Sequence, residues 1–155
     1  MTAISEIRCS IARTLDIVGD RWALMVLRDI HSGITRFDAI QANLGLSRKV
    51  LAQRLAELTE QGVIERRPYS EHPPRFDYVL TQKGSELGVV LLAMIAWGDR
   101  WTDDGGGPPA LLRHTACGQH TAAVPTCAAC GEVLLPDAIA IEPQPVPARQ
   151  STDLC

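Results

Sequence analysis

Apolar residues recur at intervals of three and four along the first 43 residues, which is the spacing of amphipathic helices. This pattern predicts short helices over residues 11–18 and 22–30, with Gly19 separating them. A third short helix is expected over residues 36–43, before Gly45. Each of these helices should bury one face against the others.

Residues 46–62 have the strongest helical pattern in the chain. Ser47 is suited to the N-cap and Gly62 to the position just beyond the C-terminus, so both ends are marked. The apolar residues form one stripe, and the polar residues of the first turns lie outside it. The polar side chains left free for a partner include Arg48, Lys49 and Gln53.

The period changes after Gly62, where two β-prone runs replace the helical spacing. These runs, residues 63–67 and 75–80, predict a hairpin with a long tip over residues 68–74. A last helix is expected over residues 81–101, and its apolar residues cover more than one narrow stripe. So wide an apolar surface needs more than one neighbour, since in a monomer part of it would be exposed to solvent.

The order of these elements predicts a winged helix-turn-helix, a mainly α fold with a small β-hairpin wing. The major groove of DNA accepts an α-helix, and cations on a hairpin can hold the phosphate backbone. We therefore expect a double-stranded DNA operator as the partner. The residues expected to contact it are Arg36, Ser47, Arg48, Lys49, Gln53, Arg54, Arg66, Arg67 and Arg75.

A family resemblance runs through the same part of the chain, over residues 8–101. The segments that carry it are residues 9–24, 36–38, 51–58, 62–66 and 73–81. In this order and without large gaps, they resemble the HxlR-type regulators, which are winged-helix relatives of the MarR group. The resemblance implies a homodimer in which the first and last helices of the domain pack across a two-fold axis.

The resemblance also implies transcriptional regulation, with repression favoured, in response to a small-molecule, thiol or metal signal. Cys9 matches the N-terminal cysteine that several family members use as a thiol sensor. The alternative is that Cys9 is a small buried apolar residue at the start of a helix. A pocket for a small-molecule effector, lined by Trp22, Met94 and Trp97, is a further hypothesis, and simple core packing is its alternative.

The net charge of −3 is unfavourable for a DNA-binding protein until the chain is divided. Residues 1–101 hold 13 Lys and Arg against 12 Asp and Glu, whereas residues 102–155 hold 2 against 6. The acidity therefore belongs to the C-terminal part, and bulk charge does not exclude DNA as a partner.

Glycines and prolines at residues 105–109 interrupt every periodic pattern. We expect a DNA-binding and dimerisation domain over residues 1–101 and a linker over residues 102–110. A small module over residues 111–135 and a Pro-rich tail over residues 136–155 should follow. No internal repeat is evident in the sequence.

The small module contains three cysteines and two histidines within 17 residues. Its Cys-x2-Cys-Gly pattern is typical of a zinc knuckle, which places two thiolates on one tight turn. We expect a structural zinc ion there, and a loop without metal is the alternative. The expected ligands are His114, Cys117, Cys127 and Cys130, with His120 as the alternative histidine.

Other classes of function fit the sequence less well. A thiol oxidoreductase would need its Cys-x2-Cys near a βαβ unit, and no Ser-His-Asp or paired-carboxylate arrangement can be assembled, so we do not expect an enzyme. A winged helix used only for protein contacts remains an alternative. The polar N-terminus lacks a secretory signal and no apolar run is long enough to span a membrane, so we expect a cytoplasmic protein.

Overall fold

The structure, a computed structural model, describes residues 9–142. The chain forms two compact units, Met1–Ala123 and Val124–Cys155, which are described separately. The division falls inside the segment 111–135, which the sequence predicts to be one module. Cys155 and the Pro-rich tail beyond residue 142 lie outside the described residues.

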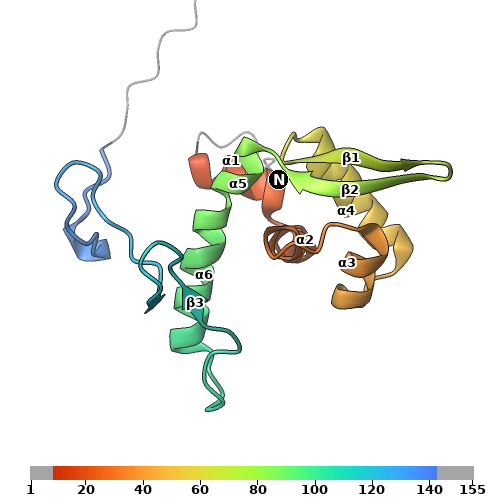
Figure 1. The fold of residues 1–155 in the computed structure, drawn as a ribbon. Coiled ribbons are helices and arrows are strands. Elements are labelled where there is room, and N and C mark those ends of the chain that lie inside the picture. The colour runs from red at the N-terminus through yellow and green to blue at the C-terminus, as the bar shows by residue number, and fades with distance from the viewer. Residues whose placement is uncertain (1–8, 143–155) are drawn as a thin grey trace, which may run out of the picture. The chain divides into compact units, whose positions relative to one another are not determined.

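Four helices precede the hairpin in the first unit (Figure 1). The predicted helices are confirmed, and caps mark their ends. The Asp20 carboxylate accepts a hydrogen bond of 2.9 Å from the backbone N–H of Trp22, and Gly45 has a φ of 65°. The four helices are α1 (Ser10–Val18), α2 (Arg21–His31), α3 (Phe37–Leu44) and α4 (Arg48–Glu60).

The hairpin consists of the antiparallel strands β1 (Ile64–Glu71) and β2 (Pro74–Leu80). The predicted long tip over residues 68–74 is therefore wrong, because only His72 and Pro73 lie outside the strands. Pro68 is compatible with β1 because this strand pairs on one side only, where a proline without an N–H group is tolerated. The register of the pairing also shifts between Pro68 and Ser70. The wing is thus longer and more regular than the sequence indicates.

The single helix predicted over residues 81–101 is two helices, α5 (Gln82–Glu86) and α6 (Gly88–Trp101). The Thr81 hydroxyl caps α5 by accepting a hydrogen bond of 3.2 Å from the N–H of Gly84. A Cβ atom at Gly84 would lie 2.1 Å from the Val63 carbonyl oxygen. α5 is therefore held against the base of the hairpin, whereas α6 packs on α2.

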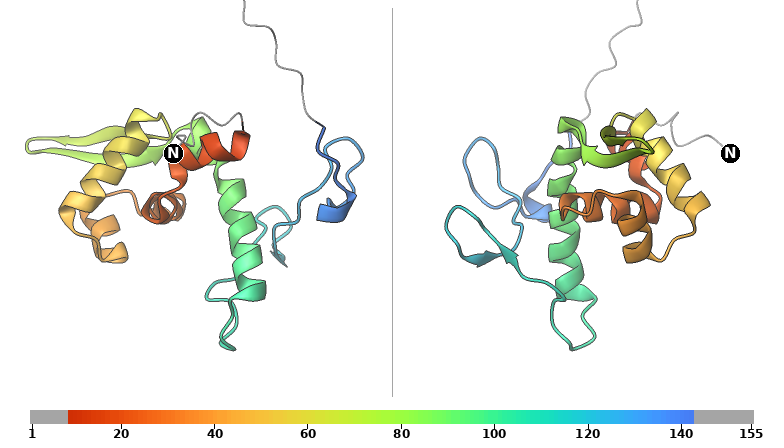
Figure 2. Two further views of the ribbon diagram at one scale, coloured as in Figure 1. Left: turned by 180° about the vertical axis from the view of Figure 1, so that it is seen from behind. Right: turned by 45° about the vertical axis from the view of Figure 1, so that its right-hand side comes forward.

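The hydrophobic core lies where α2, α3 and α4 meet the base of the hairpin (Figure 2). Leu27 of α2, Ile40 of α3 and Leu51 of α4 are fully buried there. α6 contributes only partly buried residues to this core. The helix-turn-helix is therefore a rigid platform, since its helices share one packed interior. Within residues 9–142, no helix combines the length and the apolar character needed to cross a membrane.

Short elements follow the helical part of the chain. In the first unit, β3 (Leu112–Arg113) and β4 (His120–Thr121) form a small antiparallel hairpin. In the second unit, Thr126 and Val133 form an isolated bridge, and a 3₁₀ turn, η2 (Pro136–Ala138), follows.

Candidate nucleic-acid interface

The N-terminal end of α4 is fixed in the way its sequence predicts. The Ser47 hydroxyl accepts a hydrogen bond of 3.3 Å from the N–H of Val50, and Gly62 beyond the helix has a φ of 65°. Leu51 is buried, whereas Lys49 and Gln53, which share a face one turn apart, are exposed. α4 therefore presents its first turns to solvent while its apolar stripe holds it on the core.

A groove of about 460 Å³ lies beside this helix end, between the N-termini of α3 and α4 and the hairpin. Three arginines from three separate elements line it: Arg36 before α3, Arg48 at the start of α4, and Arg75 on β2. We call it the arginine groove. Phosphate groups are bound by such convergent cations, and the positive end of the α4 dipole adds to the same field.

Aromatic rings and carboxylates hold two of these arginines in place. The Arg36 guanidinium lies 4.6 Å from the ring centroid of Tyr69, and its Nε lies 3.7 Å from Asp77 Oδ1. The Arg48 guanidinium lies 4.8 Å from the Phe37 centroid, and its Nη1 lies 3.1 Å from an oxygen of Asp38. Because these arginines are exposed, the pairs add little stability and leave both cations accessible.

The adjacent arginines of β1, Arg66 and Arg67, point to opposite faces of the hairpin, since side chains alternate along a strand. Arg66 lies 4.0 Å from the Phe76 ring centroid and borders a second groove against α4. Arg67 is paired with Glu65 at 2.8 Å on the exposed surface. The hairpin therefore carries cations on both faces, and Arg75 is the one that lines the arginine groove.

Arg54 differs from the other residues expected to contact DNA. Its side chain is 23% exposed and is ion-paired with Glu57 and with Asp20, whose Oδ1 lies 3.3 Å from Arg54 Nε. The Asp20 contact lacks hydrogen-bond geometry, so it is electrostatic only. Arg54 joins α4 to the N-terminus of α2 and does not line the arginine groove.

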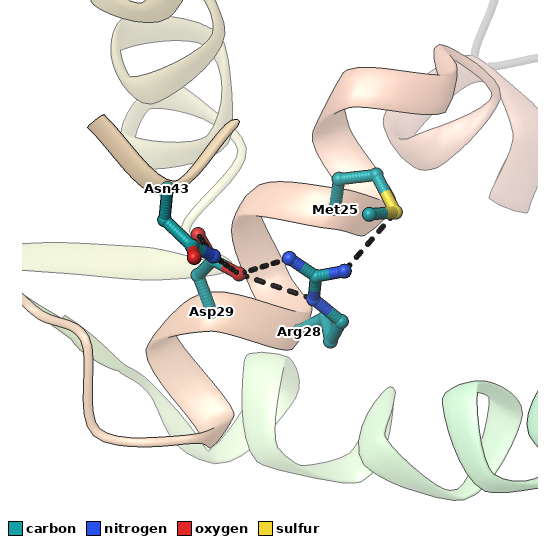
Figure 3. A network of polar contacts seen from close by, with 4 residues as sticks. All are labelled: Met25, Arg28, Asp29 and Asn43. Atoms are coloured by element: carbon teal, nitrogen blue, oxygen red, sulfur yellow. Dashed lines mark hydrogen bonds and ion pairs between the residues drawn. The ribbon is translucent and has the colours of Figure 1, made fainter. Parts of the chain in front are cut away.

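A polar network around the buried Asp29, which the sequence analysis did not identify, joins α2 to α3 (Figure 3). Asp29 is 1% exposed, and its carboxylate accepts hydrogen bonds from Asn43 Nδ2 at 2.9 and 3.0 Å. The same carboxylate accepts from Arg28 Nε at 3.1 Å and from Nη2 at 2.6 Å. Its signal in the sequence is an acidic residue between apolar positions of α2, at 27 and 30. The network sets the position of α3 on α2.

Exposed apolar side chains gather on α1 and α6. Trp97 is 63% exposed and Trp101 is 65% exposed on α6, and Ile11 is 70% exposed on α1. The three residues of the hypothetical effector pocket lie in different surroundings. Trp22 packs against the core, whereas Met94 and Trp97 are exposed. α1 and α6 therefore leave a large apolar surface without a partner in this protomer.

Known proteins with similar sequences include the same elements. The pattern of the family described as HxlR-like helix-turn-helix matches residues 17–105, which include α2, α3, α4 and the hairpin. The chain belongs to this family. The "Uncharacterized HTH-type transcriptional regulator Rv3095" of Mycobacterium tuberculosis is 39% identical over 136 residues, covering 88% of this chain and 86% of the relative. The HTH-type regulator YvaP of Bacillus subtilis is 36% identical over 100 residues, covering 64% and 93%.

Solved structures resemble this HxlR-like chain as well. PA1607, described as a candidate transcription factor, has a TM-score of 0.81 and 31% identity, covering 92% of this chain and 100% of its own. The redox regulator HypR in its reduced form has a TM-score of 0.58 and 28% identity, covering 61% and 95%. The likeness to Rv3095 covers 136 of the 155 residues of this chain, so it includes residues 20–136 wherever it begins. The likeness to Rv3095 therefore extends past the helix-turn-helix into the predicted zinc ligands.

Cys9, the predicted thiol sensor, is the N-cap residue of α1 in this HxlR-like fold. Its side chain is half-buried, and its carbonyl oxygen accepts a hydrogen bond of 3.1 Å from the N–H of Arg13. Cys9 is therefore part of the helix start, and its thiol makes no capping bond.

The predicted zinc ligands lie two by two on separate tight turns. His114 Nδ1 lies 3.2 Å from Cys117 Sγ in the first unit. In the second, the backbone N–H groups of Cys130 and Ala129 hydrogen-bond the Cys127 sulfur and lower the pKa of its thiol. Over the described residues, neither unit by itself brings together three potential metal ligands. Each turn therefore carries one pair of the predicted ligands.

Proposed function

We propose that this protein is a DNA-binding transcriptional regulator in which α4 enters the major groove and the hairpin lies against the adjacent backbone. The arginine groove carries the proposal, because it gathers cations beside the exposed first turns of a capped helix. Its arginines would bind phosphates and set the position of α4. Lys49 and Gln53 would then reach the base edges. The regulators to which the chain is similar support this function through their names.

We also propose that the regulator acts as a homodimer, with α1 and α6 forming the interface. The exposed apolar side chains of these two helices, among them Ile11 and Trp97, provide the surface that a second copy would cover. A two-fold axis would place two α4 helices on half-sites about 34 Å apart, or one turn of DNA. The operator should accordingly be pseudo-palindromic.

The proposed regulator responds to a small-molecule, thiol or metal signal and represses its promoter. The thiol alternative has the more specific support, since HypR and YodB, to which the fold is similar, are described in reduced and oxidised or diamide-treated forms. Cys9 is the sensor in this proposal, because its place at the start of α1 is next to the proposed dimer surface. Oxidation there would change the spacing of the two recognition helices.

The first prediction tests DNA binding through its dependence on salt. Arg36→Ala, Arg48→Ala and Arg75→Ala should each weaken binding to every duplex and lower the log–log salt slope by about 1, because each removes one phosphate contact. The measurement is fluorescence anisotropy with a genomic fragment selected by the protein and with an unrelated duplex. Arg113→Ala, which removes an exposed arginine of β3, is the matched control and should bind like the wild type.

Two outcomes would contradict this assignment. A wild-type protein without salt-dependent DNA binding would favour the rival function, a winged helix that contacts only proteins. Arginine-groove variants that match Arg113→Ala would show that the backbone is held elsewhere.

The second prediction concerns the reading of base sequence. Lys49→Ala and Gln53→Ala should reduce discrimination at individual base pairs by about 1–3 kcal/mol, because these exposed side chains lie on the first turns of α4. Selection from a random duplex library would show which base positions lose their preference. Glu60→Ala, at the far end of α4, should leave the selected sequence unchanged. An identical preference in all three variants would place base readout outside α4.

A further inference from the structure

A pocket of about 420 Å³ lies where the C-terminal end of α2 meets the first half of α6. Residues of α2, α5, α6 and β3 line it, and all of these elements belong to the first compact unit. It shares no residue with the arginine groove. Small-molecule sites in proteins have volumes of about 300–1,000 Å³, so this pocket, which we call the α2–α6 pocket, is of a suitable size.

The walls of the α2–α6 pocket are aliphatic. α6 contributes Leu92 and Ile95, and β3 contributes Leu112. Phe, Tyr and Trp are absent from the lining residues that the structure describes, so a planar ligand would find no large aromatic face to stack on. The walls therefore favour a flexible hydrocarbon chain, whose affinity rises about fourfold with each buried CH₂ group.

Hydrogen-bond donors gather at the α2 end of the pocket. They are Arg28 and His31 in the last turn of α2, Ser32 just beyond it, and Ser85 in α5. None of the lining residues that the structure describes is acidic. The N–H of Ser32 donates to the carbonyls of Arg28 and Asp29 at 3.0 Å, so these helix-end carbonyls are already occupied. This end of the pocket therefore suits an anion.

The two sides of the Arg28 guanidinium have partners of different strength (Figure 3). Nε and Nη2 donate to Asp29 Oδ1 at 3.1 and 2.6 Å. Nη1 donates to Met25 Sδ at 4.0 Å, and a thioether sulfur is a weak acceptor. A ligand carboxylate would be a much stronger acceptor for Nη1, and the Arg28 side chain is exposed enough to receive it.

His31 is placed at the same end of the pocket by its contact with α6. A Cβ atom at Gly88 would lie 2.6 Å from His31 Nε2, so a larger residue there would displace the ring. The imidazole is exposed and can donate a hydrogen bond. Because Arg28 and His31 are three residues apart on one face of α2, both can reach one bound carboxylate.

We propose that the α2–α6 pocket binds the anion of a medium-chain aliphatic carboxylic acid, with its carboxylate at Arg28 and His31. The hydrocarbon chain of the acid lies along Leu92, Ile95 and Leu112. None of the three residues of the effector pocket predicted from the sequence lines this site. The acid is the effector of the regulator, and this role rests on the proposed function, whereas binding of the acid does not.

Arg28 also connects the pocket to the helix-turn-helix. The Asp29 carboxylate that holds Arg28 accepts hydrogen bonds from Asn43 and so joins α2 to α3. A bound carboxylate competes with Asp29 for the guanidinium and favours a looser arrangement of these helices. A ligand that binds one arrangement more tightly shifts the protein towards it, so the acid should lower the affinity for the operator.

The test is isothermal titration calorimetry of the full-length chain, without DNA, with octanoate, 1-octanol and octylamine as probes of equal chain length. Octanoate should bind at least about 10-fold more tightly than the other two, because it alone places a negative charge beside Arg28. Hexanoate should bind about 10-fold more weakly than octanoate, because it buries two fewer CH₂ groups. Equal binding of the three eight-carbon probes, or no binding of octanoate, would overturn the proposal.

Two variants with matched controls locate the site. His31→Ala should weaken octanoate binding at least about 10-fold and leave 1-octanol binding unchanged, whereas His120→Ala, which removes another exposed histidine, should bind both like the wild type. Leu112→Glu places a negative charge in the wall and should abolish octanoate binding. Leu111→Glu, at the neighbouring position outside the lining, should not change it. Octanoate binding that survives in both pocket variants would show that the acid binds elsewhere.

Operator binding by the same proteins separates this site from the proposed function. Saturating octanoate should weaken operator binding at least about 5-fold in the wild type and leave it unchanged in Leu112→Glu. Octanoate binding with an unchanged operator affinity would refute the effector role. A protein that binds octanoate and no DNA would contradict the proposed function and leave the acid site intact, and DNA binding without octanoate binding would do the reverse.

Discussion

The Asp29→Ala protein is expected to unfold with a free energy about 2 kcal/mol lower than that of the wild type. The substitution removes a carboxylate that is 1% exposed and accepts hydrogen bonds from both Arg28 and Asn43. Arg28 is 42% exposed and can be solvated after the change, so the loss should be smaller than that for a fully buried ion pair. Because the network joins α2 to α3, the variant should also loosen the helix-turn-helix.

Urea unfolding at one protein concentration would measure this loss as a lower midpoint with an unchanged slope. Asp38→Ala is the matched control, since it removes an aspartate that is 85% exposed and paired with Arg48. That variant should remain within about 0.5 kcal/mol of the wild type. Equal stability of the two variants would mean that the Asp29 network contributes no more than a surface ion pair.

The Trp97→Glu protein is expected to be a monomer and to bind the full operator at least about 100-fold more weakly than the wild type. A charge on α6 would have to be buried without a partner if a second copy covered this face. Separated protomers would each reach one half-site, and the gain from binding two linked half-sites would be lost. Light scattering after size-exclusion chromatography and anisotropy with full and half operators would measure both effects.

Leu111→Glu is a close control for this experiment. Leu111 is 62% exposed and Trp97 is 63% exposed, and Leu111 lies outside α1 and α6. It should remain dimeric and bind the operator normally. If Trp97→Glu is also dimeric, the interface does not involve α6, and if Leu111→Glu is monomeric too, the effect is not specific to that helix.

Local chemistry made the helix-turn-helix predictable from the sequence. The start and end of α4 followed from Ser47 and Gly62, since a capping hydroxyl and a left-handed glycine act over a few residues. The exposed surface of α4 followed from the same periodicity. Arg54 could not be placed in this way, because its burial depends on Asp20, which approaches it from another helix.

Other features depend on contacts that a local pattern does not contain. The separation of α5 from α6 follows the close approach of Gly84 to the Val63 backbone, which an uninterrupted apolar period does not reveal. The length of the hairpin was hidden by prolines that are compatible with edge strands. The likeness of the two turns that carry the predicted zinc ligands was hidden, because they share only the run Ala-Cys-Gly and His114 takes the place that Cys127 has in the other.

The paired arginines of the groove have a consequence for how such a protein would search a chromosome. In the proposed DNA complex, Asp77 beside Arg36 and Asp38 beside Arg48 would compete with phosphate, and DNA would have to displace a carboxylate at these two arginines. This competition would lower the affinity for all DNA sequences by a similar factor and would leave discrimination by base contacts unchanged. The carboxylates would thereby shorten each stay at an incorrect site, and the molecule would sample more of the genome in a given time.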